Sequence, residues 1–184
     1  MNTNLTEKYN KEVIPKMKEK FGYKNNLAVP AIKKIVINAG LGKMSQQANF
    51  NEKILPEIVK DLSVIAGQKP ATTTAKKSIA GFKIRTGQVV GLKIILRRRK
   101  MNDFLERLIN IVLPRVKDFK GIDLHGIDKN GNLSIGLKEH VVFPEINSDL
   151  LRFDFGLEIS IVSNTKNREE AMELYRLLGI PLKK

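Results

Sequence analysis

Residues 88–97 read QVVGLKIILR, a run of β-branched and aliphatic side chains that is typical of a β-strand. Residues 31–38, AIKKIVIN, have a similar composition and lead into a glycine turn at residues 39–42. Residues 132–138 and 155–163 alternate apolar and polar side chains, which is the pattern of a strand with one buried face. These runs predict a sheet that is covered on one face.

Helical patterns lie between and beside these strands. Residues 102–117 carry a continuous apolar face, residues 49–66 carry an apolar stripe at i, i+3/i+4 spacing, and residues 4–20 predict a short polar helix. The last helix opens at Asn167, with Glu170 three residues on at capping-box spacing. The order predicts an α+β fold, an antiparallel sheet with helices packed on one face.

The segment before the first quoted strand, residues 67–87, reads GQKPATTTAKKSIAGFKIRTG and holds five Lys or Arg but no Asp or Glu. It predicts a short strand followed by a long basic loop at about residues 70–87. Cations, hydroxyls and open backbone N–H groups hold phosphate oxygens. Composition predicts that this loop is disordered without RNA. A solvated loop without a partner is the alternative.

The net charge of +14 is unevenly spread. Residues 69–120 carry +11, residues 1–68 carry +5, and residues 121–184 carry −2. A localised basic region in a chain of pI about 10.0 is typical of a polyanion binder. A membrane surface would require a basic amphipathic helix, which the loop lacks, so no membrane partner is predicted.

The length of 184 residues predicts a single domain, 1–184, from which the basic loop protrudes. No apolar run approaches the length of a membrane span, the N-terminal residues lack the apolar centre of a signal peptide, and cysteine is absent. We therefore expect a cytoplasmic protein.

The sequence carries no recognisable catalytic pattern. Its two histidines, His125 and His140, are expected in a loop or at a strand edge, and no metal-ligand spacing, nucleophile elbow or P-loop is present. The prediction is a non-enzyme without cofactor or metal. A two-metal nuclease built from distant carboxylates is the alternative in this class.

The sequence patterns favour a folded RNA as the polyanion that this chain binds. Residues 31–38 and 88–97 contain no aromatic side chain, so base stacking of the kind used by an RRM is not expected to dominate. No helix concentrates the residues of a DNA recognition helix. Contacts to phosphate and 2′-OH groups of a folded RNA are expected. The cations at residues 97–100 lie at a strand end and helix start, where the positive end of the helix dipole repels them. We therefore infer a bound polyanion at this position. A solvated cluster is the alternative.

A long signature is formed by residues 62–70, LSVIAGQKP, and residues 74–85, TAKKSIAGFKIR. It resembles that of the large ribosomal subunit protein five family, the universal 5S rRNA-binding ribosomal proteins, in its bacterial form. Further matches follow the family order over nearly the whole chain: IVIN at 35–38 with Gly40 and Gly42, LPR at 113–115, DFKG at 118–121, GN at 131–132 with Gly136, and FPEI at 143–146.

The resemblance implies a structural role in the central protuberance of the 50S subunit. It implies 5S rRNA, 23S rRNA, P-site tRNA, neighbouring 5S-binding ribosomal proteins and a small-subunit head protein across an intersubunit bridge as partners. The family contacts to 5S rRNA fall on Asn38 and Gln68, which we expect at one sheet edge. A threonine contact of many members falls on Ile95 and is not carried over.

The predicted site residues form two groups. The 5S rRNA-binding group is Asn38, Gln68, Lys69, Arg97, Arg98 and Arg99. The tRNA-contacting group is Thr72, Thr74, Lys76, Lys77, Ser78, Lys83 and Arg85. The alternative function is a free RNA-binding regulator or chaperone with an RRM-like sheet.

Overall fold

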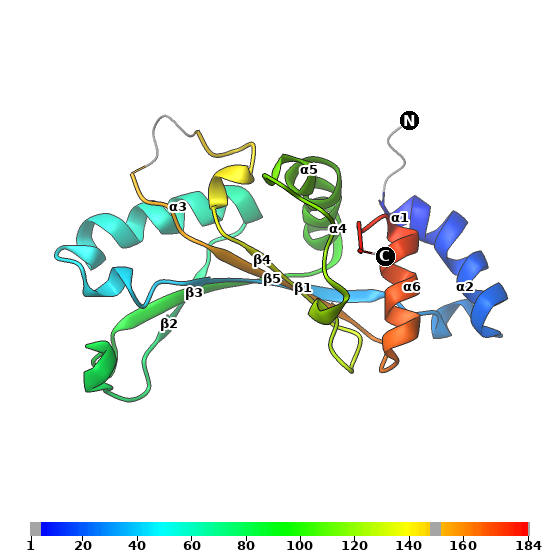
Figure 1. Cartoon of the computed structure of the whole chain (residues 1–184), viewed down its shortest axis with the longest axis horizontal. Coiled ribbons are helices and arrows are strands. Elements are labelled where there is room, and N and C mark those ends of the chain that lie inside the picture. The colour runs from blue at the N-terminus through cyan, green and yellow to red at the C-terminus, as the bar shows by residue number, and fades with distance from the viewer. Residues whose placement is uncertain (1–4, 148–151, 184) are drawn as a thin grey trace. The chain divides into compact units, whose positions relative to one another are not determined.

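A computed structural model of the chain describes residues 5–147 and 152–183 (Figure 1). The helices are α1 (Leu5–Lys8), α2 (Ile14–Phe21), α3 (Leu55–Ala66), α4 (Arg98–Arg107), α5 (Leu113–Arg115) and α6 (Arg168–Leu178). The strands are β1 (Ile32–Gly40), β2 (Ala71–Thr74), β3 (Val89–Leu96), β4 (Leu133–Leu137) and β5 (Leu157–Ser163). Single π-helical segments precede α2, α3 and α5, at Tyr9–Val13, Phe50–Ile54 and Leu108–Val112.

The strands form one antiparallel sheet in the order β2-β3-β1-β5-β4, so the predicted α+β class is confirmed. The edge strand β2 pairs antiparallel with β3, with Ala71 opposite Lys93 and Thr73 opposite Gly91. The pairing shifts by one position between Thr73 and Thr74. All four long strands lie where apolar patterning predicts them, and β2 is the predicted short strand.

The chain divides into two compact units, which are described separately. Unit 1 comprises Met1–Ile35, Arg97–Ile135 and Ser160–Lys184, and unit 2 comprises Val36–Leu96 and Gly136–Ile159. The single domain expected from length stays a prediction.

In unit 2, α3 covers one face of the strands (Figure 1). Its residues Ile58, Leu62 and Ile65 are buried, as are Leu92, Ile94 and Leu96 of β3. The odd-numbered Lys93 and Ile95 alternate with them and are exposed. The strands of unit 2 therefore bury an aliphatic face under α3 and leave the opposite face open to solvent.

Unit 1 contains a fully buried tyrosine on its last helix. The hydroxyl of Tyr175, on α6, donates to the backbone oxygen of Gly131 at 2.7 Å, and the Ser163 hydroxyl donates to the same oxygen at 3.0 Å. The ammonium of Lys8 donates to the oxygen of Leu178 at 3.1 Å, at the carboxyl end of α6. The N-terminal helices are thus fixed to the last helix, because a cation at a helix C-terminus meets the negative end of its dipole.

The N-terminus of α6 is capped by Asn167, as the capping-box spacing predicts, with Thr165 as an additional partner. The Asn167 side chain accepts from the backbone N–H of Glu169 at 3.0 Å, as a cap should. Glu170 does not reach back to Asn167 directly. Instead Thr165 donates to the Glu170 carboxylate at 2.7 Å and accepts from the Asn167 N–H at 3.0 Å. The box is therefore closed through a threonine hydroxyl.

Three element boundaries differ from the prediction. The helix expected over 102–117 begins at Arg98, because the apolar face that guided the prediction starts one turn inside the helix. The helix expected over 4–20 is helical from Leu5 to Phe21 with Pro15 in the first turn of α2, and Asn4 lies outside the described residues. The first strand continues into the glycine turn and ends at Gly40.

Candidate nucleic-acid interface

The basic hairpin, residues 70–88, is built as an extension of the β2–β3 pair in unit 2. Beyond β2, the N–H of Ala75 donates to the oxygen of Gln88 at 2.9 Å, and the N–H of Gly87 donates to the oxygen of Ala75 at 2.9 Å. The Ser78 and Thr86 hydroxyls lie 3.0 Å apart across the hairpin. Backbone pairing and hydroxyl contacts thus give a hairpin form to a segment that has no core of its own. Its disorder in the absence of RNA stays a prediction.

Gln88 fixes the base of the hairpin to the rest of unit 2. Its side-chain amide donates to the backbone oxygen of Ser45 at 2.8 Å, and its side-chain oxygen accepts from the N–H of Arg85 at 3.0 Å. The amide of Gln46 donates to the backbone oxygen of Phe82 at 2.8 Å, at the far end. The 44–46 turn thus supports the hairpin at its base and near its tip.

The cations of the basic hairpin are exposed and have no acidic neighbour. Lys76, Lys77, Lys83 and Arg85 are all exposed, and none of them forms an ion pair with an acidic residue in residues 5–147 or 152–183. Four positive charges without a counter-charge repel each other, so binding of an external anion would stabilise their placement. The hydroxyls of Thr72 and Thr74 belong to the exposed surface of β2, while that of Ser78 is engaged with Thr86.

Asn38 lies on the open face of unit 2. It is exposed on β1, between the buried residues Ile37 and Ala39. The expectation that it lies at a sheet edge is wrong, because β1 is the central strand of the order. Its carboxamide is therefore presented from the middle of the face, where it can donate and accept hydrogen bonds at once.

Gln68 and Lys69 are on the short connection from α3 to the edge strand β2. The helix ends at Gly67, whose φ of 62° is the left-handed conformation that glycine adopts freely. Both following side chains are exposed, and Pro70 is buried behind them. The strand β3 separates β2 from β1, so Gln68 and Asn38 lie on elements two strands apart in the sheet order.

The remaining predicted residues, Arg97, Arg98 and Arg99, belong to unit 1. They open α4, which has no side-chain N-cap and no acidic residue in its first turn. Arg99 is nearly fully exposed, and its guanidinium lies 3.8 Å from the Asp103 carboxylate. A first turn of cations is unfavourable beside the positive end of the helix dipole, which supports the inference of an anionic partner at this position.

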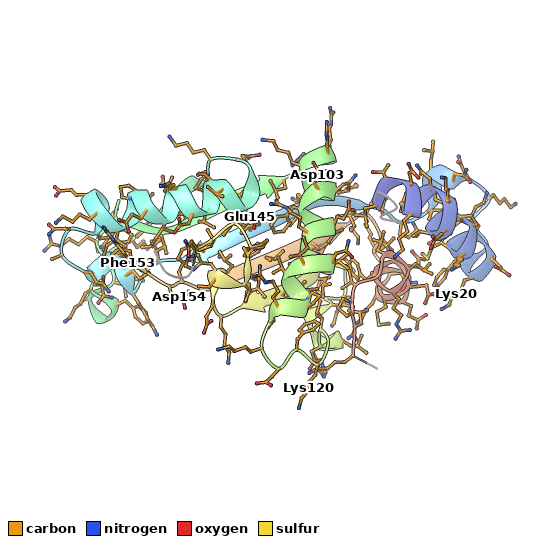
Figure 2. The ribbon with its side chains drawn as sticks, turned by 90° about the horizontal axis from the view of Figure 1, so that it is seen from above. Lys20, Asp103, Lys120, Glu145, Phe153 and Asp154 are labelled. Carbon is orange, nitrogen blue, oxygen red and sulfur yellow. The ribbon has the colours of Figure 1, made fainter. Side chains whose placement is uncertain are left out.

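His140 lies in the 3-10 turn His140–Val142 between β4 and β5, a loop position as the sequence predicts. The sequence does not predict its burial, and the side chain is fully buried in unit 2. Its Nδ1 lies 3.0 Å from the carboxylate of Asp154, a residue labelled in Figure 2, and its Nε2 lies 3.8 Å from the carboxylate of Asp61. The ring also stacks on Phe155 at 3.9 Å between centroids. Burial raises the pKa of Asp61, while the charge of His140 opposes that rise.

His140 therefore ties α3 to the segment that precedes β5. No sequence spacing reveals this, because the three residues are far apart in the chain. Within the described parts of the chain, no group of three or more His, Cys, Asp or Glu residues has the arrangement of a metal site. No helix there is both long and apolar enough to cross a membrane.

Comparison with known proteins gives concordant matches in both parts of the chain. The family model described as "Ribosomal protein L5" matches residues 25–85, and the model described as "ribosomal L5P family C-terminus" matches residues 89–182. The chain is similar to the large ribosomal subunit protein uL5 of Geotalea daltonii, at 51% identity over 179 residues, covering 97% of this chain and 98% of the relative.

Other relatives are aligned almost end to end. The large ribosomal subunit protein uL5 of Desulforapulum autotrophicum is 51% identical over 181 residues, covering 98% of this chain and 99% of the relative. The protein of the same name from a Thermoanaerobacter species is 48% identical over 182 residues, covering 99% of both.

Proposed function

Because the chain belongs to the ribosomal protein L5 family, we propose that it binds 5S rRNA and helps to attach it in the central protuberance, and that it contacts P-site tRNA through the basic hairpin. The family is one of structural, non-enzymatic proteins of the large ribosomal subunit. Membership makes the chain an rRNA-binding constituent of the 50S subunit in the cytoplasm, which favours this reading over a free RNA-binding regulator.

The observation that carries the tRNA proposal is the unpaired charge of the basic hairpin. Lys76, Lys77, Lys83 and Arg85 belong to a hydrogen-bonded, solvent-exposed hairpin that contains no acidic residue. Phosphate contacts do not depend on base sequence. Such contacts suit a partner whose sequence changes from one elongation cycle to the next.

The open face of unit 2 supports the 5S rRNA proposal. A carboxamide such as that of Asn38 can bond 2′-hydroxyls and base edges in the wide, shallow minor groove of an RNA helix. Gln68 and Lys69 extend the polar surface at the start of β2. Ile95 is exposed on β3 of the same face, so the position where many members carry a threonine presents an apolar side chain that offers RNA no hydrogen bond.

We also assign Arg97, Arg98 and Arg99 of unit 1 to rRNA, either 5S or 23S, as phosphate ligands. They neutralise charge and carry no base specificity in this proposal. The intersubunit bridge and the neighbouring 5S-binding proteins remain part of the proposal at the level of the family, without assigned residues.

The 5S rRNA proposal is tested by Asn38→Ala, with Asn110→Ala as the matched control. Asn110 is also an exposed asparagine, but it lies on the 108–112 segment of unit 1. Loss of one or two hydrogen bonds predicts about a 2- to 20-fold weaker affinity of Asn38→Ala for 5S rRNA. Wild-type affinity of Asn38→Ala, or an equal loss in both variants, contradicts the assignment of the open face.

The division of labour between hairpin and sheet is tested by the double variant Lys76→Ala, Lys77→Ala. Lys117→Ala, Lys120→Ala is the control, because it removes the same charge from exposed positions of unit 1. The hairpin variant is expected to speed release of P-site tRNA from ribosomes that contain it and to keep wild-type affinity for 5S rRNA. Equal loss of both interactions contradicts the proposal.

A further inference from the structure

The tip of the basic hairpin presents an apolar surface that charge alone does not explain. Phe82 is 66% exposed and Ile79 is 48% exposed. Among the large apolar side chains that the described residues leave exposed, Phe82 is the aromatic one. Ile84, from the same tip, is half-buried, and its Cδ1 would lie 4.0 Å from a Cβ added at Gly42.

The backbone of the tip holds this arrangement in place. Residues Ala80–Phe82 form a 3-10 turn, in which the N–H of Phe82 donates to the oxygen of Ile79 at 3.2 Å. Lys83 follows with a left-handed φ of 50°, and reciprocal backbone bonds of 2.9 and 3.2 Å join Ile79 to Ile84. Gln46 secures the oxygen of Phe82 from outside the hairpin. The exposed ring is therefore held by a hydrogen-bonded backbone, and such preorganisation lowers the entropy lost on binding.

The charges around the ring decide what it contacts. Lys76, Lys77, Lys83 and Arg85 surround the tip in sequence, and residues 67–87 contain no acidic side chain. A ligand for this surface combines negative charge with a flat apolar face. Nucleotides have both, since phosphates bind the cations and every base offers a π-face to an aromatic ring.

We propose that Phe82, with Ile79 beside it, is a stacking platform for an unpaired or helix-end base of the RNA whose phosphates the hairpin cations hold. The inference rests on the proposed tRNA contact and adds a base-stacking element to it. Stacking tolerates any base, so the platform remains compatible with a partner of changing sequence. The expectation that base stacking does not dominate was drawn from the aromatic-free strands, and it stays a prediction beside this proposal.

The sequence supplies a direct test, because it contains no tryptophan. Phe82→Trp introduces one, at the proposed platform, and stacking on a base quenches indole fluorescence. The full-length variant is titrated with an elongator tRNA while binding is followed by anisotropy of labelled tRNA. Leu27→Trp is the control, since Leu27 is 89% exposed but lies in unit 1.

We expect strong quenching of Phe82→Trp by bound tRNA and none of Leu27→Trp. If the wild-type chain does not prefer tRNA over another folded RNA, the proposed tRNA contact fails, and a single-stranded oligonucleotide then tests the platform by itself. Quenching by that oligonucleotide supports the platform. Binding of either RNA without quenching overturns it.

Affinity and salt dependence separate stacking from general apolar contact. Phe82→Ala and Phe82→Leu are expected to bind about 5- to 100-fold more weakly, with the salt slope of the wild type unchanged, because no phosphate contact is removed. Full affinity of Phe82→Leu overturns the proposal, since an apolar pocket of a protein partner accepts leucine as well as phenylalanine. All of these substitutions lie at an exposed position, so the fold is retained.

Discussion

Gly131 closes the turn before β4, and replacing it with alanine should destabilise unit 1 for two independent reasons. Its φ is 75°, in the left-handed region that side chains rarely occupy. A Cβ added there would lie 2.8 Å from the Cβ of Ala171 and 2.9 Å from Cγ2 of Thr165. Its backbone oxygen also accepts the hydroxyls of Tyr175 and Ser163, so any displacement of the turn disturbs two buried hydrogen bonds.

The expected loss follows from these contributions. A left-handed alanine costs about 1–2 kcal/mol, and overpacking costs about 1–3 kcal/mol. Reduced freedom of the unfolded chain offsets about 0.4–1 kcal/mol. Gly131→Ala should therefore lower the free energy of unfolding by about 2–4 kcal/mol. Gly22→Ala has the same backbone strain, φ 72°, but nothing within 4 Å of its added Cβ, so it should cost about 1 kcal/mol.

Intrinsic fluorescence reads out this pair of variants. The three tyrosines, Tyr9, Tyr23 and Tyr175, all belong to unit 1, and tryptophan is absent, so tyrosine emission during urea denaturation follows that unit. The difference between the two variants measures the steric contribution alone. Equal stability of Gly131→Ala and Gly22→Ala would refute the close packing of the turn against α6.

The buried Tyr175 makes unit 1 sensitive to alkaline pH. Burial raises the pKa of its phenol above the ordinary value of about 10. Its contribution to the free energy of unfolding is therefore complete below about pH 10 and is lost at higher pH, where the phenol ionises in the unfolded chain but stays neutral in the folded one. Tyr175→Phe should thus cost about 1 kcal/mol in free energy of unfolding at pH 7. It should lose less stability than the wild type as the pH rises above about 10, because it has no phenol at this position to ionise. Circular dichroism followed against pH measures both losses, and equal losses would contradict the burial of the hydroxyl. His140→Ala should destabilise unit 2 by about 2–4 kcal/mol and speed hydrogen exchange in α3, whereas unchanged exchange contradicts its bridging role. Gly91→Ala should cost about 1–3 kcal/mol, because its Cβ would lie 2.9 Å from the backbone oxygen of Ala39, and Gly40→Ala, with open space around it, is the control for the same exchange measurement.

The sequence was most informative where one periodic pattern dominated. The alternation in 132–138 and the apolar stripe in 49–66 each reflect burial of one face, so strands and helices follow from them directly. Boundaries were harder, since α4 begins with Arg98, a residue that no apolar pattern marks. The π-helical segment before α5 was not foreseen, because it continues the same apolar face.

The candidate site was predictable in composition and less so in geometry. The absence of acidic residues from 67–87 predicts the charged surface. Composition does not predict the hairpin, because its form depends on hydrogen bonds from Gln46 and Gln88. The burial of His140 depends on Asp61, 79 positions away in the chain, which no local pattern shows. The exposure of Phe82 and the half-burial of Ile84 are likewise tertiary features, which no local sequence pattern shows.

The central claim is specific recognition of 5S rRNA, and equilibrium binding tests it most directly. The full-length chain is titrated with 5S rRNA and with a folded RNA of equal length across a salt series. We predict a preference of about 4 kcal/mol or more for 5S rRNA, and a salt slope that corresponds to about five to ten neutralised phosphates. Equal affinity for the two RNAs at every salt concentration would contradict the claim, because it would leave only a general attraction between a basic protein and a polyanion.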